Sequence, residues 1–255
     1  MKILFIGDVV GQYAAKKLAE FLPGFKRKNN IDITVINGEN SANGNGITPF
    51  SANILLPVSD VITTGNHCFK RVEMNSMYDE NDRIIRPHNL GEGVRGKGYS
   101  ILDFGKHKFV VINLMGSAFM QPCDNPFKAI IELLSKLDTP NIIVDFHAEA
   151  TGEKKAMLYM LASKVSAVLG THTHVQTADE QIFDDHTAYI TDVGMTGSHD
   201  SIIGAEKEGL VNRFLNYVPT RHIEASGNIQ INAVMLEVIP ETGKASSISR
   251  IMNLI

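Results

Sequence analysis

The sequence predicts an α/β fold in which layered, mixed β-sheets are flanked by helices. β-rich apolar segments alternate with amphipathic helical segments along most of the 255 residues, an order typical of sheets covered by helices. The tail then holds two apolar segments around a Pro-Glu-Thr-Gly turn at 240–243, which indicates an antiparallel hairpin. No repeat, linker or low-complexity segment divides the sequence, so we expect a single domain over residues 1–255.

The predicted strands are short runs rich in Val, Ile and Leu, a composition that suits a buried sheet. They lie at residues 2–7, 31–36, 60–63, 109–114, 141–146, 166–169 and 187–191, followed by the hairpin strands 229–239 and 245–251. The predicted helices either repeat apolar side chains at helical spacing or begin just after a proline. They lie at residues 13–22, after Pro49, at 127–137 and at 153–162.

The composition is that of a globular protein with a sizeable core. Hydrophobic residues make up 44% of the chain and charged residues 20%, which excludes a disordered chain. The net charge is −4, with no extended basic block, which argues against a dedicated nucleic-acid groove. A nucleotide substrate is not excluded, because bound metal ions could supply the positive charge.

The N-terminal segment is predicted to be the first strand and not a signal peptide. Its apolar stretch is short, and Asp8 follows it without a small-residue cleavage site. No segment approaches the ~20 apolar residues of a membrane span. Cys68 and Cys123 are expected to be free thiols in a chain without a secretion signal. We therefore expect a cytoplasmic protein.

Five polar segments follow predicted strands, where ligands bind in open α/β sheets. They are residues 7–11 (Gly-Asp-Val-Val-Gly), 37–40 (Asn-Gly-Glu-Asn), 64–67 (Thr-Gly-Asn-His), 145–149 (Asp-Phe-His-Ala-Glu) and 170–174 (Gly-Thr-His-Thr-His). On extended backbone, His172 and His174 project to the same side, close enough to serve neighbouring metal ions.

Each segment alone has an ordinary structural interpretation. Asp8 could cap a turn or helix, and Glu39, Asn40 and Asn66 could belong to solvated loops. His67 and His147 could be structural histidines. With structural interpretations alone, all of these segments would have to meet at one sheet edge by chance. Their combination therefore favours a metal site.

A glycine-rich segment at residues 91–97 (Gly-Glu-Gly-Val-Arg-Gly-Lys) has the spacing of a nucleotide-binding loop. Gly98 stands where such a loop needs Ser or Thr, and no strand and helix flank it. We expect a loop near the mouth of the active site instead.

These segments together resemble the calcineurin-like metallophosphoesterase superfamily, with its G-D-x-x-G, G-N-H and G-H-x-H signatures. Within it, residues 7–11, 37–40, 145–151, 170–177 and 191–197 are similar to the YmdB family over nearly the whole chain. The resemblance implies a layered metallophosphoesterase-like sandwich. Two positions depart from the family: His88 stands in its Arg-Pro-Ala-Asn stretch, and Arg95 replaces the proline of its Pro-Gly step. Both lie outside the implied metal ligands and leave the substrate preference open.

The resemblance also implies a two-metal site. One ion would be bound by Asp8, Glu39, Asn40 and His174, and the other by Glu39, Asn66, His147 and His172, so that Glu39 bridges them. A metal-bridging hydroxide would attack the phosphate, and His67 would be the general acid. A nitrogen and oxygen ligand set suits iron or manganese, and zinc less well.

The implied function is hydrolysis of small cyclic nucleotides such as 2′,3′-cyclic AMP, with 3′,5′-cyclic AMP as a second candidate. The alternatives are a phosphomonoesterase or RNA-processing nuclease on the same metal site, or a regulatory binding protein that carries the metals without turnover. We expect a small phosphodiester substrate and a homo-oligomer; the charge does not indicate RNA, which the sequence leaves open.

Overall fold

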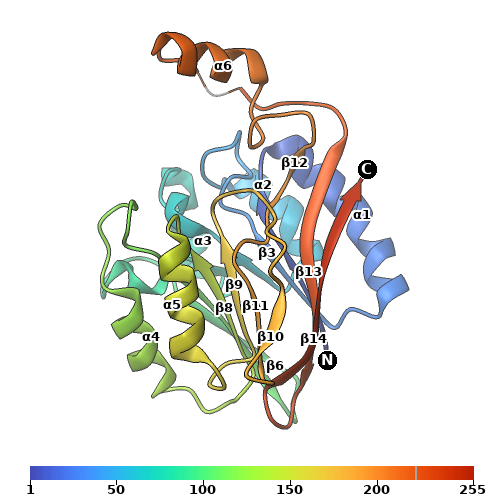
Figure 1. Cartoon of the computed structure of the whole chain (residues 1–255), viewed down its shortest axis with the longest axis vertical. Coiled ribbons are helices and arrows are strands. Elements are labelled where there is room, and N and C mark those ends of the chain that lie inside the picture. Colours follow the sequence, from blue (N-terminus) through green and yellow to red (C-terminus); the bar gives the residue numbers. More distant parts are fainter. Residues whose placement is uncertain (222) are drawn as a thin grey trace.

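The computed structural model describes residues 1–221 and 223–255. Two β-sheets are stacked face to face, with helices outside each of them (Figure 1). The predicted fold class, mixed sheets flanked by helices, is confirmed. Both cysteines, Cys68 and Cys123, are free thiols, as predicted. In the described part of the chain, no helix is long and apolar enough to cross a membrane.

The first sheet has eight strands in the order β2-β12-β13-β1-β3-β4-β5, with β14 paired to β13. β1 runs parallel to β3 and antiparallel to β13, so the sheet is mixed. The strands are β1 (Lys2–Ile6), β2 (Asp8–Val9), β3 (Ile33–Asn37), β4 (Val61–Thr63), β5 (Ile84–Ile85), β12 (Met195–Ser198), β13 (Ile229–Ile239) and β14 (Lys244–Leu254).

The second sheet has six strands in the order β10-β11-β9-β8-β7-β6. Its central strands β7, β8, β9 and β11 are parallel, and β6 and β10 are antiparallel edges. The strands are β6 (Tyr99–Asp103), β7 (Lys108–Met115), β8 (Ile142–His147), β9 (Ala167–Thr171), β10 (Gln181–Phe183) and β11 (Thr187–Ile190).

Six helices accompany the sheets in the described residues. They are α1 (Gln12–Asn29), α2 (Pro49–Leu55), α3 (Asn75–Glu80), α4 (Pro126–Leu134), α5 (Thr151–Leu161) and α6 (Lys207–Asn216). Figure 1 shows α1 on one side of the stacked sheets, α4 and α5 on the other, and α6 extending from the top of the body. Short 3₁₀ turns at Leu56–Val58, Gly65–His67, Val72–Met74 and His88–Leu90 complete the structure.

The alternation of side chains along each strand builds three apolar layers. In β1, Leu4 and Ile6 pack with α1 and α2, whereas Ile3 and Phe5 face the second sheet. This is the two-residue period of an extended strand. The layer between the sheets is almost wholly aliphatic, and a third layer joins the second sheet to α4 and α5. This packing fixes the strand ends that carry the polar segments.

Several elements differ from the sequence prediction. The helix predicted at 13–22 continues through Pro23 to Asn29, because Phe25 packs on Phe21 at 5.2 Å and against the core. Packing there outweighs the cost of an interior proline. β6, β10, β12, α3 and α6 were not predicted, since their segments are short or, in α6, lack a buried face.

Candidate metal centre

All predicted site residues lie where strands of the two sheets end. Asp8 begins β2 directly after β1, and Glu39 and Asn40 follow β3. Asn66 and His67 lie in the 3₁₀ turn after β4, His147 ends β8, and His172 and His174 follow β9. The polar segments were expected at one edge of a single sheet. They belong instead to two facing sheets, and their side chains converge between the sheet ends.

Glu39 joins the first group of possible ligand atoms to His147 and His172. The contributing atoms of these three residues all lie within 4.8 Å of one another. Glu39 Oε2 is 3.0 Å from His147 Nε2, and His172 Nδ1 is 3.1 Å from the same nitrogen. The Asn66 Oδ1 atom, also 2.9 Å from His147 Nε2, adds a fourth donor.

The second group also contains Glu39, together with Asp8 and His174, again within 4.8 Å. Asn40 is beside it, but its amide nitrogen faces the group, 2.7 Å from Glu39 Oε1 and 3.2 Å from His174 Nε2. An amide nitrogen cannot bind a metal ion. A ligand role for Asn40 therefore requires its side-chain amide to rotate by half a turn, so that Oδ1 takes the place of the amide nitrogen beside Glu39 and His174.

The close approach around Glu39 depends on Gly65. This residue has a positive φ of 47°, and a Cβ there would lie 2.3 Å from Glu39 Oε2 and 2.8 Å from His147 Nε2. Only glycine permits both the backbone conformation and the contact. Glu39 is thus enclosed between the two groups.

Each histidine is oriented by its other ring nitrogen. His147 Nδ1 lies 2.8 Å from Thr171 Oγ1, which donates to Asp145. His174 Nδ1 donates to the Ile203 carbonyl at 3.1 Å, and His172 Nε2 is 3.2 Å from Glu149 Oε2. Such contacts fix ring orientation in metal sites. They leave one nitrogen of each ring facing the cluster.

The histidine pair is not presented by an extended strand, as the sequence had suggested. β9 ends at Thr171, and His172 and His174 have φ values of 106° and 66°. Turned backbone, which side chains other than glycine rarely adopt, therefore places the two rings in the two different groups. The turn is held by Asp192, which accepts hydrogen bonds from the backbone N–H and hydroxyl of Thr173.

Burial and mutual charge shape the electrostatics of the cluster. Burial raises the pKa of Asp8 well above its usual range. Burial lowers the pKa of His147, but the charge and hydrogen bond of Glu39 and the charges of Asp8 and Asp145 together outweigh burial and raise it to about 9. Burial and the charge of His147 lower the pKa of His172 to about 3.

The donor set fits divalent metal ions. Asp8 Oδ1 is buried and has no hydrogen-bond partner among the described residues, a costly state that a cation would relieve. The donors are carboxylate, amide and imidazole groups, a mixture that suits transition metals. Cys68, beside His67, belongs to neither group of ligand atoms, and burial raises the pKa of its thiol to about 12.

Sequence reasoning missed three residues that support the cluster. Glu149 touches His172, and Asp192 forms a buried ion pair with Lys154 at 2.8 Å under the turn. Asp192 directly follows the predicted strand at 187–191, which was the available signal. Nothing in the sequence marks Lys154, a helical lysine.

The cluster opens into a cavity of about 530 Å³ whose wall includes His67. Neither His88 nor the loop 91–98 lines it. The loop was expected near the active-site mouth, but the Arg86 guanidinium binds its carbonyls at Val94 and Arg95 and holds it elsewhere. His88 packs edge-on against Tyr99.

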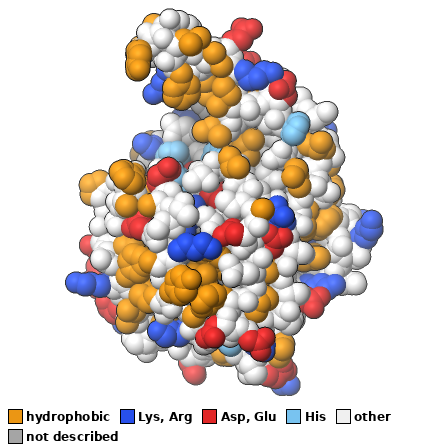
Figure 2. Space-filling model, viewed as in Figure 1, with side chains coloured by type: hydrophobic (Ala, Val, Ile, Leu, Met, Phe, Trp, Pro, Cys, Tyr) orange, Lys and Arg blue, Asp and Glu red, His pale blue; other side chains and the backbone are white. Residues whose placement is uncertain are grey.

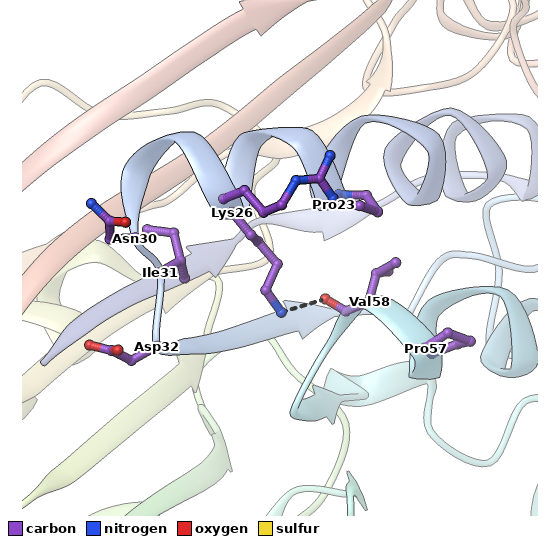
Figure 3. A pocket seen from close by; sticks show the side chains of 8 residues that line it. Pro23, Lys26, Asn30, Ile31, Asp32, Pro57 and Val58 are labelled. Carbon is purple, nitrogen blue, oxygen red and sulfur yellow. Dashed lines mark hydrogen bonds between the residues drawn. The ribbon is translucent and has the colours of Figure 1, made fainter.

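A larger cavity of about 640 Å³ lies at the C-terminal end of α1, where Lys26 donates to the Val58 carbonyl (Figure 3). None of the predicted site residues lines it. Its size therefore does not make it the candidate site.

A family model described as "YmdB-like protein" matches residues 4–251. The chain belongs to the YmdB-like family. It is 42% identical over 255 residues to the 2′,3′-cyclic-nucleotide 2′-phosphodiesterase of Bacillus subtilis (strain 168), covering 99% of this chain and 97% of that protein. The predicted family resemblance is thereby confirmed.

Two solved structures of relatives share the architecture of this YmdB-like protein. A hypothetical protein from Thermus thermophilus has a TM-score of 0.93 at 37% identity, covering 100% of this chain and 99% of that one. A phosphatase from Mycoplasma pneumoniae has a TM-score of 0.94 at 33% identity, covering 100% and 93%. The layered sandwich is common to all three.

Proposed function

We propose that this protein hydrolyses small cyclic nucleotide diesters at a centre of two divalent metal ions, with 2′,3′-cyclic AMP as the preferred type and 3′,5′-cyclic AMP as a further candidate. The observation that carries the proposal is the position of Glu39, whose carboxylate belongs to both groups of ligand atoms. The name of the Bacillus subtilis relative supports the substrate class.

The family match and the names of the relatives, a phosphodiesterase and a phosphatase, confirm the predicted metal-dependent phosphoric diester hydrolase. The number of metal ions, their identity and the general acid remain parts of the proposal.

The proposed ligands are the seven residues predicted from the sequence. One ion would be held by Asp8, Glu39, Asn40 and His174, the other by Glu39, Asn66, His147 and His172, and the two groups around Glu39 support this division. When bound, such ions supply positive charge to the phosphate and acidify water. We propose iron or manganese, with zinc as a weaker fit, since the ligand set lacks thiolate.

His67 is the proposed general acid. Its side chain lines the cavity and is 24% exposed, whereas the neighbouring Glu39 is 1% exposed. His67 Nδ1 lies 3.4 Å from Glu39 Oε1, and this contact holds one edge of the ring even when the Asn40 amide, whose Oδ1 lies 2.8 Å from the same nitrogen, turns toward the metal. The other ring nitrogen is then available to give a proton to the departing ribose oxygen.

The test is a comparison of diesters with monoesters. Purified protein loaded with manganese should show a higher kcat/KM for 2′,3′-cyclic AMP and bis-p-nitrophenyl phosphate than for AMP, and chelation should abolish both activities. Faster release of phosphate from monoesters with several metals would favour a phosphatase. Bound metal without turnover of any phosphoester would favour a regulatory binding protein.

We also propose that the protein is cytoplasmic and that it assembles as a homo-oligomer. Sedimentation equilibrium of the purified chain tests the second. RNA is not proposed as the substrate, because the net charge is −4 and the sequence has no extended basic block.

A further inference from the structure

The cavity above the metal centre has walls of two chemical kinds. The first wall carries the polar cluster, including Glu39, His67 and His174. The second wall is mainly apolar and comes from the segment before α6 and from α6 itself. Its apolar side chains are Ile202, Ile203, Ala205, Leu210 and Phe214, and Arg213 of α6 adds one cationic side chain. The two walls are tied together, because the Ile203 carbonyl accepts the hydrogen bond from His174 Nδ1.

The apolar wall includes the largely exposed phenyl ring of Phe214. α6 has no buried residue, and Phe214 is 73% exposed although it lines the cavity. Figure 1 shows α6 standing away from the body, and Figure 2 shows hydrophobic side chains gathered on that projection. Phe214 is the only Phe, Tyr or Trp among the described residues that line this cavity. An exposed ring beside a polar site is a surface suited to an aromatic ligand group.

We infer that Phe214 binds the base of the nucleotide substrate by stacking, so that α6 sets the preference for nucleotides over other cyclic diesters. This inference rests on the proposed function. A phosphate at the polar cluster leaves the base as the planar part of the substrate, and the adjoining wall of the same cavity is apolar except for Arg213. Stacking removes both the ring of Phe214 and a face of the base from water.

The test compares a cyclic nucleotide with a cyclic phosphodiester that lacks a base. Alanine substitution of a stacking aromatic side chain weakens base binding. The kcat/KM of Phe214→Ala for 2′,3′-cyclic AMP is therefore expected to fall by roughly 5- to 150-fold. Its kcat/KM for glycerol 1,2-cyclic phosphate should be unchanged. Phe214→Tyr should restore most of the activity on 2′,3′-cyclic AMP.

Leu215→Ala is the matched control. Leu215 is 72% exposed on the same helix and does not line the cavity. It should leave the kcat/KM of both substrates unchanged. Circular dichroism and metal content of each variant show whether α6 and the metal centre are retained.

The outcomes separate this inference from the proposed function. If the wild-type protein hydrolyses neither cyclic ester with metal bound, the proposed function fails and the inference falls with it. If the wild type hydrolyses both, but Phe214→Ala reduces both activities equally or neither, only the inference is overturned. Equal losses together with a changed sedimentation coefficient would assign Phe214 to a contact between copies of the chain.

Discussion

At the scale of single residues, the chemistry depends on which atom each side chain presents. Thr171, Ile203 and Glu149 engage one nitrogen of each cluster histidine, and the other nitrogen faces Glu39, Asn40 or a neighbouring histidine of the cluster. The sequence predicted which polar residues follow the strands and could bind metal. It did not predict the orienting partners, because one is a backbone carbonyl and the others are ordinary polar residues.

The role of His67 is tested by the dependence of rate on the leaving group. A general acid contributes typically ~10²–10⁴-fold, so His67→Gln should reduce turnover of 2′,3′-cyclic AMP by about that factor. Bis-p-nitrophenyl phosphate should be affected much less, since p-nitrophenolate departs without a proton. Kinetic assays on both substrates give the ratio of the two losses, with metal content as the control. Equal losses, or loss of a metal ion, would make His67 a ligand or a positioning residue.

At the scale of elements, the turn after β9 is stabilised from below by a buried ion pair. Lys154 of α5 and Asp192 are each 1% exposed and 2.8 Å apart, and Asp192 also accepts hydrogen bonds from Thr173 and Gly194. This pair holds the positive-φ backbone that separates the two histidines.

Breaking that pair should be costly. Asp192→Asn leaves the Lys154 ammonium buried without its partner, which lowers the free energy of unfolding by about 3–5 kcal/mol. The double variant Asp192→Asn with Lys154→Met should recover part of this loss, because no charge is then left unpaired. Urea unfolding of the chelated protein measures both. A double variant no more stable than the single variant would show that the charge is not the cause.

A carboxylate in the loop between β9 and β10 should make stability depend on pH. Burial would raise the pKa of Asp179, but hydrogen bonds from Thr191, Thr177 and Lys155 lower it from 3.8 to about 2. A lowered pKa stabilises the fold above the unfolded value of 3.8, and this contribution is lost as pH falls toward 2.

The variant Asp179→Asn should therefore unfold at lower urea concentration than the wild type near pH 7. The gap between their midpoints should narrow as the pH is lowered from about 5 to about 3, and it should close only as the pH falls toward 2. Urea titrations of the chelated proteins across this range measure the gap. A gap that stays constant with pH would mean that the negative charge of Asp179 does not contribute to the free energy of unfolding.

Local patterns predicted the central strands well, because β1, β3, β8 and β9 are buried on both faces and read as apolar runs. β12 escaped prediction, since Met-Thr-Gly-Ser becomes a strand only by pairing with distant β2 and β13. The extent of α1 was likewise decided by packing.

At the scale of the whole molecule, the candidate site exists only because two sheets meet. Asp8 and Glu39 come from the first sheet, and His147 and His172 follow strands of the second. The sequence placed these residues at strand ends, but it held no information on how two sheets would face each other. Metal ions bound between them would link the sheets, with Glu39 as the shared ligand.

The most direct test is the metal content of the wild-type protein and of Glu39→Gln, measured by elemental analysis after saturation with manganese and removal of free ions. The wild type should retain two ions per chain. Glu39→Gln should lose affinity for both, because the amide carries no negative charge to share, whereas the control variant Glu20→Gln, on the exposed surface of α1, should retain both. One ion or fewer in the wild type, or loss of a single ion with the other fully retained in Glu39→Gln, would contradict a bridging Glu39.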